Sequence, residues 1–233
     1  YRLMKIHAFI CTREKTLSTT TENLVSYLSR CKIEVKLIVN AKSIFSGYQK
    51  AFKEAKPGSK DIIILCHDDI EILLGEKYFL KILIEELTNV KTGFIGPAGT
   101  TELTSRAVWW EQEQWRDQKL RGFVFHGNDL NTGANPTYYG PYGPVATLDG
   151  LFLAARAEVL EAVDLRKPDY FDGEWDFYDI HYTHTAKKKG FVNKAVPILL
   201  LHNSAGELVG RDSWHENRQR FINENLDKFP IKV

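Results

Sequence analysis

Two adjacent aspartates follow a run of apolar residues in the first third of the chain. The run IIILC occupies residues 62–66, and His67, Asp68 and Asp69 come directly after it. Because burying carboxylates is costly and neighbouring carboxylates repel each other, this pattern predicts a partner of opposite charge. A divalent cation is the simplest partner, oxygen ligands suit Mg²⁺ or Mn²⁺, and a metal indicates a phosphate-bearing ligand. The alternative is that both aspartates cap the next helix or lie solvated in a turn.

A second group of acidic residues lies further along the chain. Asp172, Asp176 and Asp179 are spaced by four and three residues. This spacing would place them on one face of a helix that we expect over residues 172–190. Acidic residues near the start of that helix, with the lysines at 187–189 near its end, also suit the helix dipole. The pattern alone therefore leaves a purely structural role open.

Strands and helices alternate through residues 4–99, which is typical of βα units around a mostly parallel sheet. Apolar runs predict strands at residues 4–12, 34–40, 60–69 and 92–99. Helical patterns with capping and stop signals predict helices at residues 18–31, 46–56 and 77–89. Ligands of such sheets bind beyond the carboxyl ends of the strands, so the cluster at 67–69 is expected at a ligand-binding edge.

The regular pattern ends after residue 99. Residues 100–143 are rich in Trp, Gly, Asn, Pro and Tyr, and we expect an irregular functional loop or lid there. Order returns in the last part, 144–233, where we expect a strand and a helix in 144–163, a helix at 172–190, a strand at 191–203 and a helix at 213–228.

Composition excludes several classes of partner. The 233 residues are 43% hydrophobic and 26% charged, with 31 Lys and Arg against 30 Asp and Glu. This balance suits a globular protein with a real core and draws it neither to nucleic acid nor to a membrane surface. No apolar run approaches the ~20 residues of a membrane span. Three cysteines without a close pair favour a reducing, cytoplasmic location.

In their order and spacing, several segments resemble those of GT-A glycosyltransferases that use nucleotide sugars. The similarity is greatest to the family 2-like inverting enzymes, within a small branch that has HDD for the usual DxD, and such a domain also occurs in a chlorella-virus glycosyltransferase. The resemblance spans nearly the whole chain. It implies one continuous α/β domain of the Rossmann-like GT-A fold, with a mixed, mostly parallel sheet flanked by helices. Residues 1–99 would be its nucleotide-binding half, 100–143 an irregular acceptor-side loop region, and 144–233 its acceptor and catalytic half with the C-terminal helix. The tryptophans at 109, 110 and 115 would either stack on sugar faces or anchor that loop. The segments are IHAFICTRE (6–14), SGYQKAFKEA (46–55), GFIGPAGT (93–100), TLDGLFLAAR (147–156), FDGEWDFYDIHYTHTAKKKG (171–190) and PILLLHNSAGE (197–207).

The resemblance implies roles for the acidic cluster and for one distant histidine. Asp69 matches the family's last Asp, which binds the metal that bridges the diphosphate, and Asp68 matches a position that faces the ribose or the metal. His67 replaces the family's first Asp, so either a hydrogen bond to the nucleotide or simple packing at the strand end is open for it. His202 matches a C-terminal histidine that completes the metal shell in many GT-A enzymes. A strand-end histidine bonded to a backbone carbonyl is the alternative for His202.

Further positions follow from the same resemblance. Asp149, in TLDGLF, matches a segment that contacts the donor sugar. Asp179, counted back from Gly190, matches the general base, and Tyr178 occupies the position where the family has Glu. A guanidinium matches phosphate in a bidentate manner, which suits Arg13 to a nucleotide diphosphate. The implied nucleotide contacts in the first half are Thr12, Arg13, Asn40 and Gln49.

Two functions of different classes agree with these features. The first is a metal-dependent inverting glycosyltransferase that uses Mn²⁺ or Mg²⁺ and moves a sugar, from a UDP-sugar donor, to a glycan or other hydroxyl acceptor. The second is a binding module that keeps the nucleotide-diphosphate site without turnover, since the family positions at His67 and Tyr178 are altered. A sugar nucleotidyltransferase is a third hypothesis, which the absence of a glycine-rich, lysine-ended phosphate loop disfavours.

Overall fold

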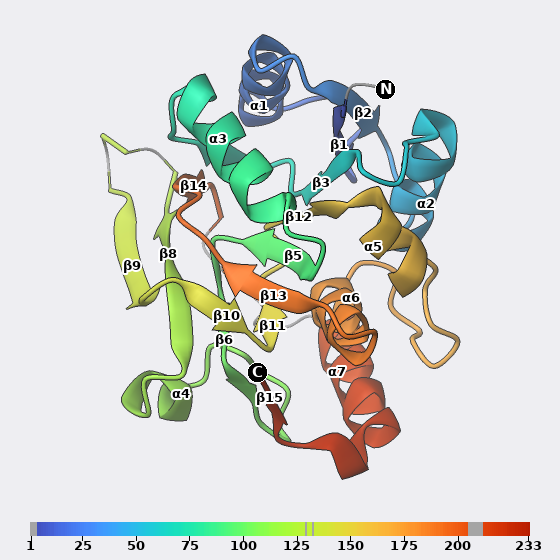
Figure 1. The fold of residues 1–233 in the computed structure, drawn as a ribbon, viewed down its shortest axis with the longest axis vertical. Coiled ribbons are helices and arrows are strands. Elements are labelled where there is room, and N and C mark those ends of the chain that lie inside the picture. The colour runs from blue at the N-terminus through green and yellow to red at the C-terminus, as the bar shows by residue number, and fades with distance from the viewer. Residues whose placement is uncertain (1–3, 129, 132, 205–211) are drawn as a thin grey trace.

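The computed structural model describes residues 4–128, 130–131, 133–204 and 212–233. It shows a single α/β domain in which helices cover both faces of a central mixed sheet, and this confirms the expected fold class (Figure 1). In Figure 1, helices α1 (Thr19–Arg30) and α3 (Glu76–Leu87) lie to the left of the sheet. The helices to its right are α2 (Ile44–Ala55), α5 (Ala157–Val163) and α6 (Tyr178–Lys188).

The central sheet has seven strands in the order β10-β13-β5-β12-β3-β1-β2. Strand β1 pairs in parallel with β2 and β3, and β13 pairs in parallel with β5. Strand β12 runs antiparallel between β3 and β5 and joins these two parallel parts. The residues of β3, β5 and β12 are all buried, as expected for strands covered on both faces. The bounds are β1 Ile6–Cys11, β2 Glu34–Ile38, β3 Ile62–Cys66, β5 Thr92–Gly96, β10 Gly143–Val145, β12 Phe152–Arg156 and β13 Val192–Ala195.

Local capping signals set the ends of the first two helices. The side chain of Ser18 accepts a hydrogen bond from the Thr21 amide at 3.1 Å, at the start of α1. Ser43 accepts from the Ser46 amide at 3.3 Å at the start of α2, which ends at Lys56 in the left-handed conformation. Each cap satisfies an amide that has no partner inside the helix. The expected helices over 18–31 and 46–56 are therefore confirmed, with α2 beginning slightly earlier.

A second sheet lies beside the first, with the order β11-β6-β8-β14-β4 and with β9 paired to β8. The prediction that residues 100–143 are irregular is wrong, because these residues hold the β8–β9 hairpin. It also contains helix α4 (Gln112–Arg116) and strand β7 (Glu102–Leu103), which pairs with β15 (Ile231–Lys232). The strands of the second sheet are β4 Ile70–Ile72, β6 Ala98–Thr100, β8 Leu120–His126, β9 Asn135–Gly140, β11 Thr147–Leu148 and β14 Leu200–His202.

A glycine in β8 interrupts the alternating apolar pattern from which a strand is predicted. Its residues alternate between buried and partly exposed positions, as in a half-buried strand. One of the buried positions is Gly122, which has a φ of 104° and at which a Cβ atom would come 1.9 Å from the carbonyl oxygen of Pro97. Only glycine fits there, so the apolar residue that would complete the alternating pattern is missing from the sequence.

Prolines divide two segments that the sequence pattern predicts as single strands. Pro197 separates β13 from β14 within residues 191–203, and Pro97 separates β5 from β6 within residues 92–99. Proline has no backbone amide to donate to a ladder, so each strand ends there. In both places the chain leaves the central sheet and joins the second sheet.

The helix expected over 172–190 begins only at Tyr178, so the prediction of three carboxylates on one helical face is wrong. The side chain of Asn217, from α7 (Asp212–Glu224), makes three hydrogen bonds to the segment that precedes the helix. They reach the amide and carbonyl of Gly173 and the carbonyl of Asp176, at 2.9 to 3.1 Å. These tertiary contacts satisfy two carbonyl groups that such a helix would pair internally, and one amide of its first turn that would have no internal partner.

The remaining expectations for the last part of the chain concern its end. Helix α7 and the short 3-10 helix Leu226–Lys228 correspond to the helix expected over 213–228. Residues 205–207 of the segment 197–207 lie outside the described residues. Within the described part of the chain, every helix is too short or too polar to cross a bilayer.

Candidate active site

A cavity of about 540 Å³ opens beyond the carboxyl ends of β1 and β3. It lies where ligands of α/β sheets commonly bind. Segments from both sheets and from the start of α6 contribute to its wall. Of the residues that the sequence singles out, the cavity is lined by Arg13, His67, Asp68, Asp69, Trp109, Trp110, Asp149, Asp176, Tyr178, Asp179 and His202.

One cluster in this cavity has the chemistry of a metal site. Single ligand atoms of His67, Asp69 and His202 all lie within 4.8 Å of one another. Nδ1 of His67 is 3.6 Å from Oδ1 of Asp69, and Nε2 of His202 is 3.5 Å from Oδ2 of the same carboxylate. It is the one such group of three among the residues described.

Strand pairing brings the distant histidine to this cluster. Strand β4 follows directly after Asp69 and pairs antiparallel with β14, so that Ile70 lies opposite His202. The amide of Asn203 also donates to the carbonyl oxygen of Asp69 at 2.7 Å. The backbone, rather than a flexible loop, therefore sets the distance between Asp69 and His202.

The charges of the cluster favour an ionised Asp69. Burial by itself would raise the pKa of Asp69, but the contacts with His202 and His67 outweigh burial and hold that pKa far below its usual range. Oδ1 of Asp69 is buried and has no hydrogen-bond partner. A buried carboxylate oxygen with an unused lone pair, facing two imidazoles, is a donor set that fits a divalent first-row metal ion.

The second acidic feature of the cavity is Asp179, at the start of α6. Its Oδ2 accepts from the amide of Gly150 and its Oδ1 from the amide of Ile180, both at 2.9 Å. Burial, followed by the negative charge of Asp149, raises the pKa of Asp179 to about 7, although the two amides and His67 act in the opposite direction. The carboxyl group is therefore oriented by the backbone and titrates near neutral pH.

Glycine is required where α6 meets the turn between β11 and β12. A Cβ atom on Gly150 would lie 2.5 Å from Oη of Tyr178 and 2.9 Å from Cβ of Asp179. Oη of Tyr178 donates to the Gly150 carbonyl at 2.8 Å and lies 2.9 Å from Nε2 of His67. The turn thus contacts both the carboxyl of Asp179 and, through one phenol, the candidate metal cluster.

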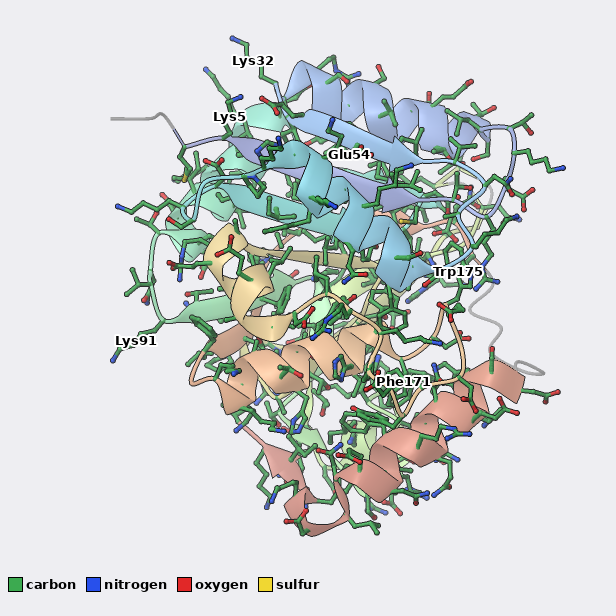
Figure 2. All side chains as sticks on the ribbon, turned by 90° about the vertical axis from the view of Figure 1, so that its right-hand side faces the viewer. Lys5, Lys32, Glu54, Lys91, Phe171 and Trp175 are labelled. Carbon is green, nitrogen blue, oxygen red and sulfur yellow. The ribbon has the colours of Figure 1, made fainter. Side chains whose placement is uncertain are left out.

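Aromatic side chains form the outer wall of the cavity. The guanidinium of Arg13 lies 4.4 Å from the ring centre of Trp175, whose Nε1 donates to the carbonyl of Lys42. Figure 2 shows Trp175 and Phe171 along the segment that leads into α6. Arg13 therefore lies at the cavity over an aromatic face.

The three tryptophans of the 100–143 segment have different surroundings. Trp109 is only 3% exposed and packs on Trp110 and Tyr139, with ring centres 5.6 and 5.2 Å apart. Trp115 is 40% exposed, packs on Tyr139, and is absent from the cavity wall. Trp109 and Trp110 both line the cavity, so anchoring of the segment and contact with a ligand are compatible roles for them.

Three expected nucleotide contacts are not part of this wall. Thr12 is buried, and its hydroxyl accepts from the amide of Glu14. Asn40 adopts a φ of 52°, and its side chain accepts from Nζ of Lys42.

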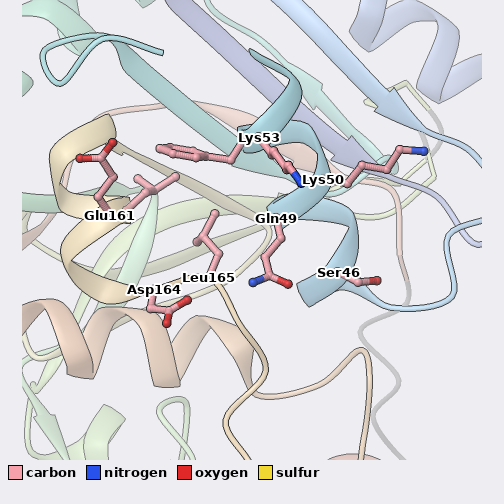
Figure 3. A pocket seen from close by; sticks show the side chains of 9 residues that line it. Ser46, Gln49, Lys50, Lys53, Glu161, Asp164 and Leu165 are labelled. Atoms are coloured by element: carbon pink, nitrogen blue, oxygen red, sulfur yellow. The ribbon is translucent and has the colours of Figure 1, made fainter. Parts of the chain in front are cut away.

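Gln49 departs furthest from its expected place. It points into a separate, shallow pocket between α2 and α5, towards Asp164 and Leu165 (Figure 3). Helical periodicity explains this position. Helix α2 begins at Ile44, and its buried residues, among them Tyr48, face the core. Gln49, the residue after Tyr48, therefore faces outwards.

Sequence reasoning missed His126. It ends β8, directly opposite His202 in the parallel β8–β14 pair, and the two ring centres are 5.7 Å apart. Nε2 of His126 lies 3.1 Å from Oη of Tyr139, and burial together with the charge of His202 lowers the pKa of His126. The strand that carries His126 lies in the segment predicted as irregular, so the sequence pattern did not place it at a sheet edge.

Comparison with known proteins identifies the family. The model of a glycosyltransferase-like family matches residues 10–224. A search of curated proteins finds no match. Among solved structures, GalNAc-T7 with UDP, GalNAc and Mn²⁺ has a TM-score of 0.56 and 12% identity, over 95% of this chain and 48% of that chain. The present chain thus spans about half of GalNAc-T7, and at this identity the likeness shows the fold alone.

Two further solved structures are also similar. A197 from STIV has a TM-score of 0.45 and 13% identity, over 86% of this chain and 83% of that chain. A glycosyltransferase involved in glycosylation of the major capsid of PBCV-1 has a TM-score of 0.35 and 9% identity, over 67% of this chain and 62% of that chain. Neither likeness is strong enough to carry an argument. The family match over most of the chain and the GT-A architecture show that this protein belongs to the glycosyltransferase-like family and is a GT-A glycosyltransferase.

Proposed function

We propose that the protein is a metal-dependent inverting glycosyltransferase that moves a sugar from a nucleoside-diphosphate sugar, in our proposal a UDP-sugar, to the hydroxyl group of a glycan or other acceptor. One observation carries the proposal. A single cavity contains a His-Asp-His cluster and a carboxyl group that titrates near neutral pH, and the turn at Gly150 contacts both.

In this proposal, His67, Asp69 and His202 hold the metal ion. Two imidazoles and one carboxylate suit Mn²⁺ better than Mg²⁺, because Mg²⁺ prefers oxygen ligands. When bound, the ion offsets the negative charge that develops on the leaving diphosphate. His67 thereby takes a ligand role, in place of the nucleotide contact that the sequence left open.

The residues around the cluster would bind the donor. The guanidinium of Arg13 reaches the cavity and can pair with diphosphate oxygens. Asp68 lines the same wall and would contact the ribose. Asp149, on the β11–β12 turn, would accept hydrogen bonds from hydroxyl groups of the donor sugar. Together these contacts would orient the anomeric carbon of the donor towards Asp179.

Asp179 would act as the general base. A pKa of about 7 is close to the optimum for a base that works near neutral pH. The amides of Gly150 and Ile180 fix the orientation of the carboxylate. The acceptor hydroxyl gives its proton to Asp179 as its oxygen bonds to the anomeric carbon, while the bond to the diphosphate oxygen breaks. Attack in line with the leaving group inverts the configuration, and no covalent enzyme intermediate forms.

The location of the protein is part of the proposal. Cys11, Cys31 and Cys66 are buried and free of disulfide bonds. Burial raises the pKa of Cys66 and of Cys11, to about 12 for Cys11, so these thiols are poor nucleophiles. Buried reduced thiols of this kind suit the cytoplasm.

The test is transfer from a panel of nucleotide sugars to glycan acceptors, with Mn²⁺ and with EDTA, followed by NMR of the product. We expect release of nucleoside diphosphate only when the metal is present. We also expect a product whose anomeric configuration is opposite to that of the donor. Retention of configuration would remove Asp179 from the role of base. In a parallel reaction with a nucleoside triphosphate and a sugar 1-phosphate, release of pyrophosphate would indicate a nucleotidyltransferase. Tight UDP binding without turnover would indicate a binding module.

A further inference from the structure

The hydrogen bonds of Tyr178 fix the position of one proton. Oη of Tyr178 lies 2.8 Å from the carbonyl oxygen of Gly150 and 2.9 Å from Nε2 of His67. A carbonyl oxygen can only accept, so the single phenolic proton is used in the bond to Gly150. The other contact of Oη is then satisfied only if Nε2 of His67 carries a proton and donates it to Tyr178.

This assignment also determines whether the other nitrogen of the same ring, Nδ1, carries a proton. A neutral imidazole has one N–H group, so a proton on Nε2 leaves the lone pair on Nδ1. Nδ1 of His67 faces Oδ1 of Asp69 at 3.6 Å, inside the cluster that also contains His202. Nδ1 carries a proton towards Asp69 only when the ring is an imidazolium, and this is the form that lowers the pKa of Asp69. We propose that Tyr178 is a positioning residue, which holds His67 in the Nε2–H tautomer so that Nδ1 is directed to the metal. The ligand part of this inference rests on the proposed metal site.

The surroundings of Tyr178 give this arrangement little freedom. The side chain is 4% exposed, and its ring contacts those of Phe45, Tyr48 and Tyr182 at centroid distances of 5.9 to 6.4 Å. The absence of a Cβ atom on Gly150 leaves the phenol just enough room to reach the carbonyl. Packing therefore holds the phenol, and the phenol holds the imidazole.

A phenol suits this position better than a carboxylate would. A carboxylate also accepts from Nε2–H, but it has no proton to give to the carbonyl of Gly150. It would place a further negative charge beside Asp179, whose pKa is already raised by burial and by the charge of Asp149. The neutral hydroxyl of Tyr178 orients His67 without that repulsion.

The first test is the tautomer of His67 in metal-free protein, measured by nitrogen-15 NMR at about pH 8.5. We expect a proton on Nε2 in the wild type, the same state in Tyr182→Phe, and mixed tautomers in Tyr178→Phe. Tyr182 is a matched control, because it lies on the same helix, is buried, and donates to the carbonyl of Leu165 at 2.8 Å without touching His67. A wild-type imidazole with its proton on Nδ1, or an unchanged spectrum in Tyr178→Phe, would overturn the inference.

The second test is Mn²⁺ affinity, measured by titration calorimetry. Loss of a residue that orients a metal ligand lowers affinity by about 10- to 100-fold, which we expect for Tyr178→Phe and not for Tyr182→Phe. Equal affinity of wild type and Tyr178→Phe would overturn the role of Tyr178 and leave the proposed function standing. If the wild type bound no divalent ion but kept the Nε2–H tautomer, the proposed metal dependence would fail while the assignment of the proton to Tyr178 held.

Discussion

The carboxyl group of Asp179 makes the stability of the protein depend on pH in an unusual direction. Its pKa is raised from 3.8 to about 7 in the folded protein, because the group is buried beside Asp149. Between these two values the folded state keeps a proton that the unfolded chain has lost. The unfolded state binds fewer protons, so the free energy of unfolding falls as pH rises, by about 1.4 kcal/mol for each pH unit. The total loss between pH 4 and pH 7 is at most about 4 kcal/mol, since the side chain keeps some contact with solvent.

The substitution Asp179→Asn removes this term. Each carboxylate oxygen accepts one backbone amide, so one of those amides will face the new NH₂ group and lose its partner. That loss costs about 1 to 3 kcal/mol at every pH. We therefore expect the variant to be less stable than the wild type near pH 4. Its relative stability should rise by up to about 4 kcal/mol by pH 8, where it should equal or exceed that of the wild type.

The assay is urea unfolding from pH 4 to pH 8 in the presence of EDTA, since a bound cation would alter the field at Asp179. Asp172→Asn is the control, because Asp172 is exposed, pairs with Arg220 and lies outside the cavity wall. Transfer activity should fall by about 10² to 10⁴-fold in Asp179→Asn and remain in Asp172→Asn. A stability difference between Asp179→Asn and wild type that did not change with pH would refute the raised pKa and, with it, the reason for choosing Asp179 as the base.

Three further changes test the rest of the site. Asp149→Asn removes the charge that helps to raise the pKa of Asp179, so the acidic limb of the kcat/KM profile should move to lower pH; an unmoved limb would contradict this coupling. Gly150→Ala places a Cβ 2.9 Å from that of Asp179 and should cost about 1 to 3 kcal/mol in thermal or urea unfolding, with loss of transfer. Gly75→Ala is its control, because nothing lies within 4 Å of a Cβ there, and similar losses in both variants would argue against a special role for Gly150. Asp69→Ala should abolish Mn²⁺ binding in calorimetry and the metal dependence of UDP binding, and retention of both would place the metal elsewhere.

Much of the nucleotide-binding half can be predicted from the sequence because its signals are local. The caps at Ser18 and Ser43 and the apolar run of β3 depend on neighbours within a few residues, and these elements form where the patterns indicate. Residues 67–69 follow the end of β3, so their place at the carboxyl edge of a parallel sheet follows from the order of βα units. The edge position of His67 and Asp69 was thus available without a structure.

Other features depend on contacts between distant segments, which no local pattern contains. Asn217 bonds the residues before Tyr178 in a non-helical conformation, so the predicted helix begins too early. Gly122 interrupts the apolar alternation of the strand that carries His126, so the sequence pattern does not predict that strand. Gln49 fits the family pattern, yet the start of α2 turns it towards a different pocket.

The sequence by itself determined which side chains could do chemistry and on which edge the first of them lie, because residue types and local periodicity are properties of the chain. Only the tertiary structure decided which of them meet. The antiparallel pairing of β4 with β14 brings His202 to Asp69, and the packing of α6 on the turn at Gly150 brings Tyr178 to His67. Both contacts join residues more than a hundred positions apart, and strand register and close packing, rather than local preference, set their distances.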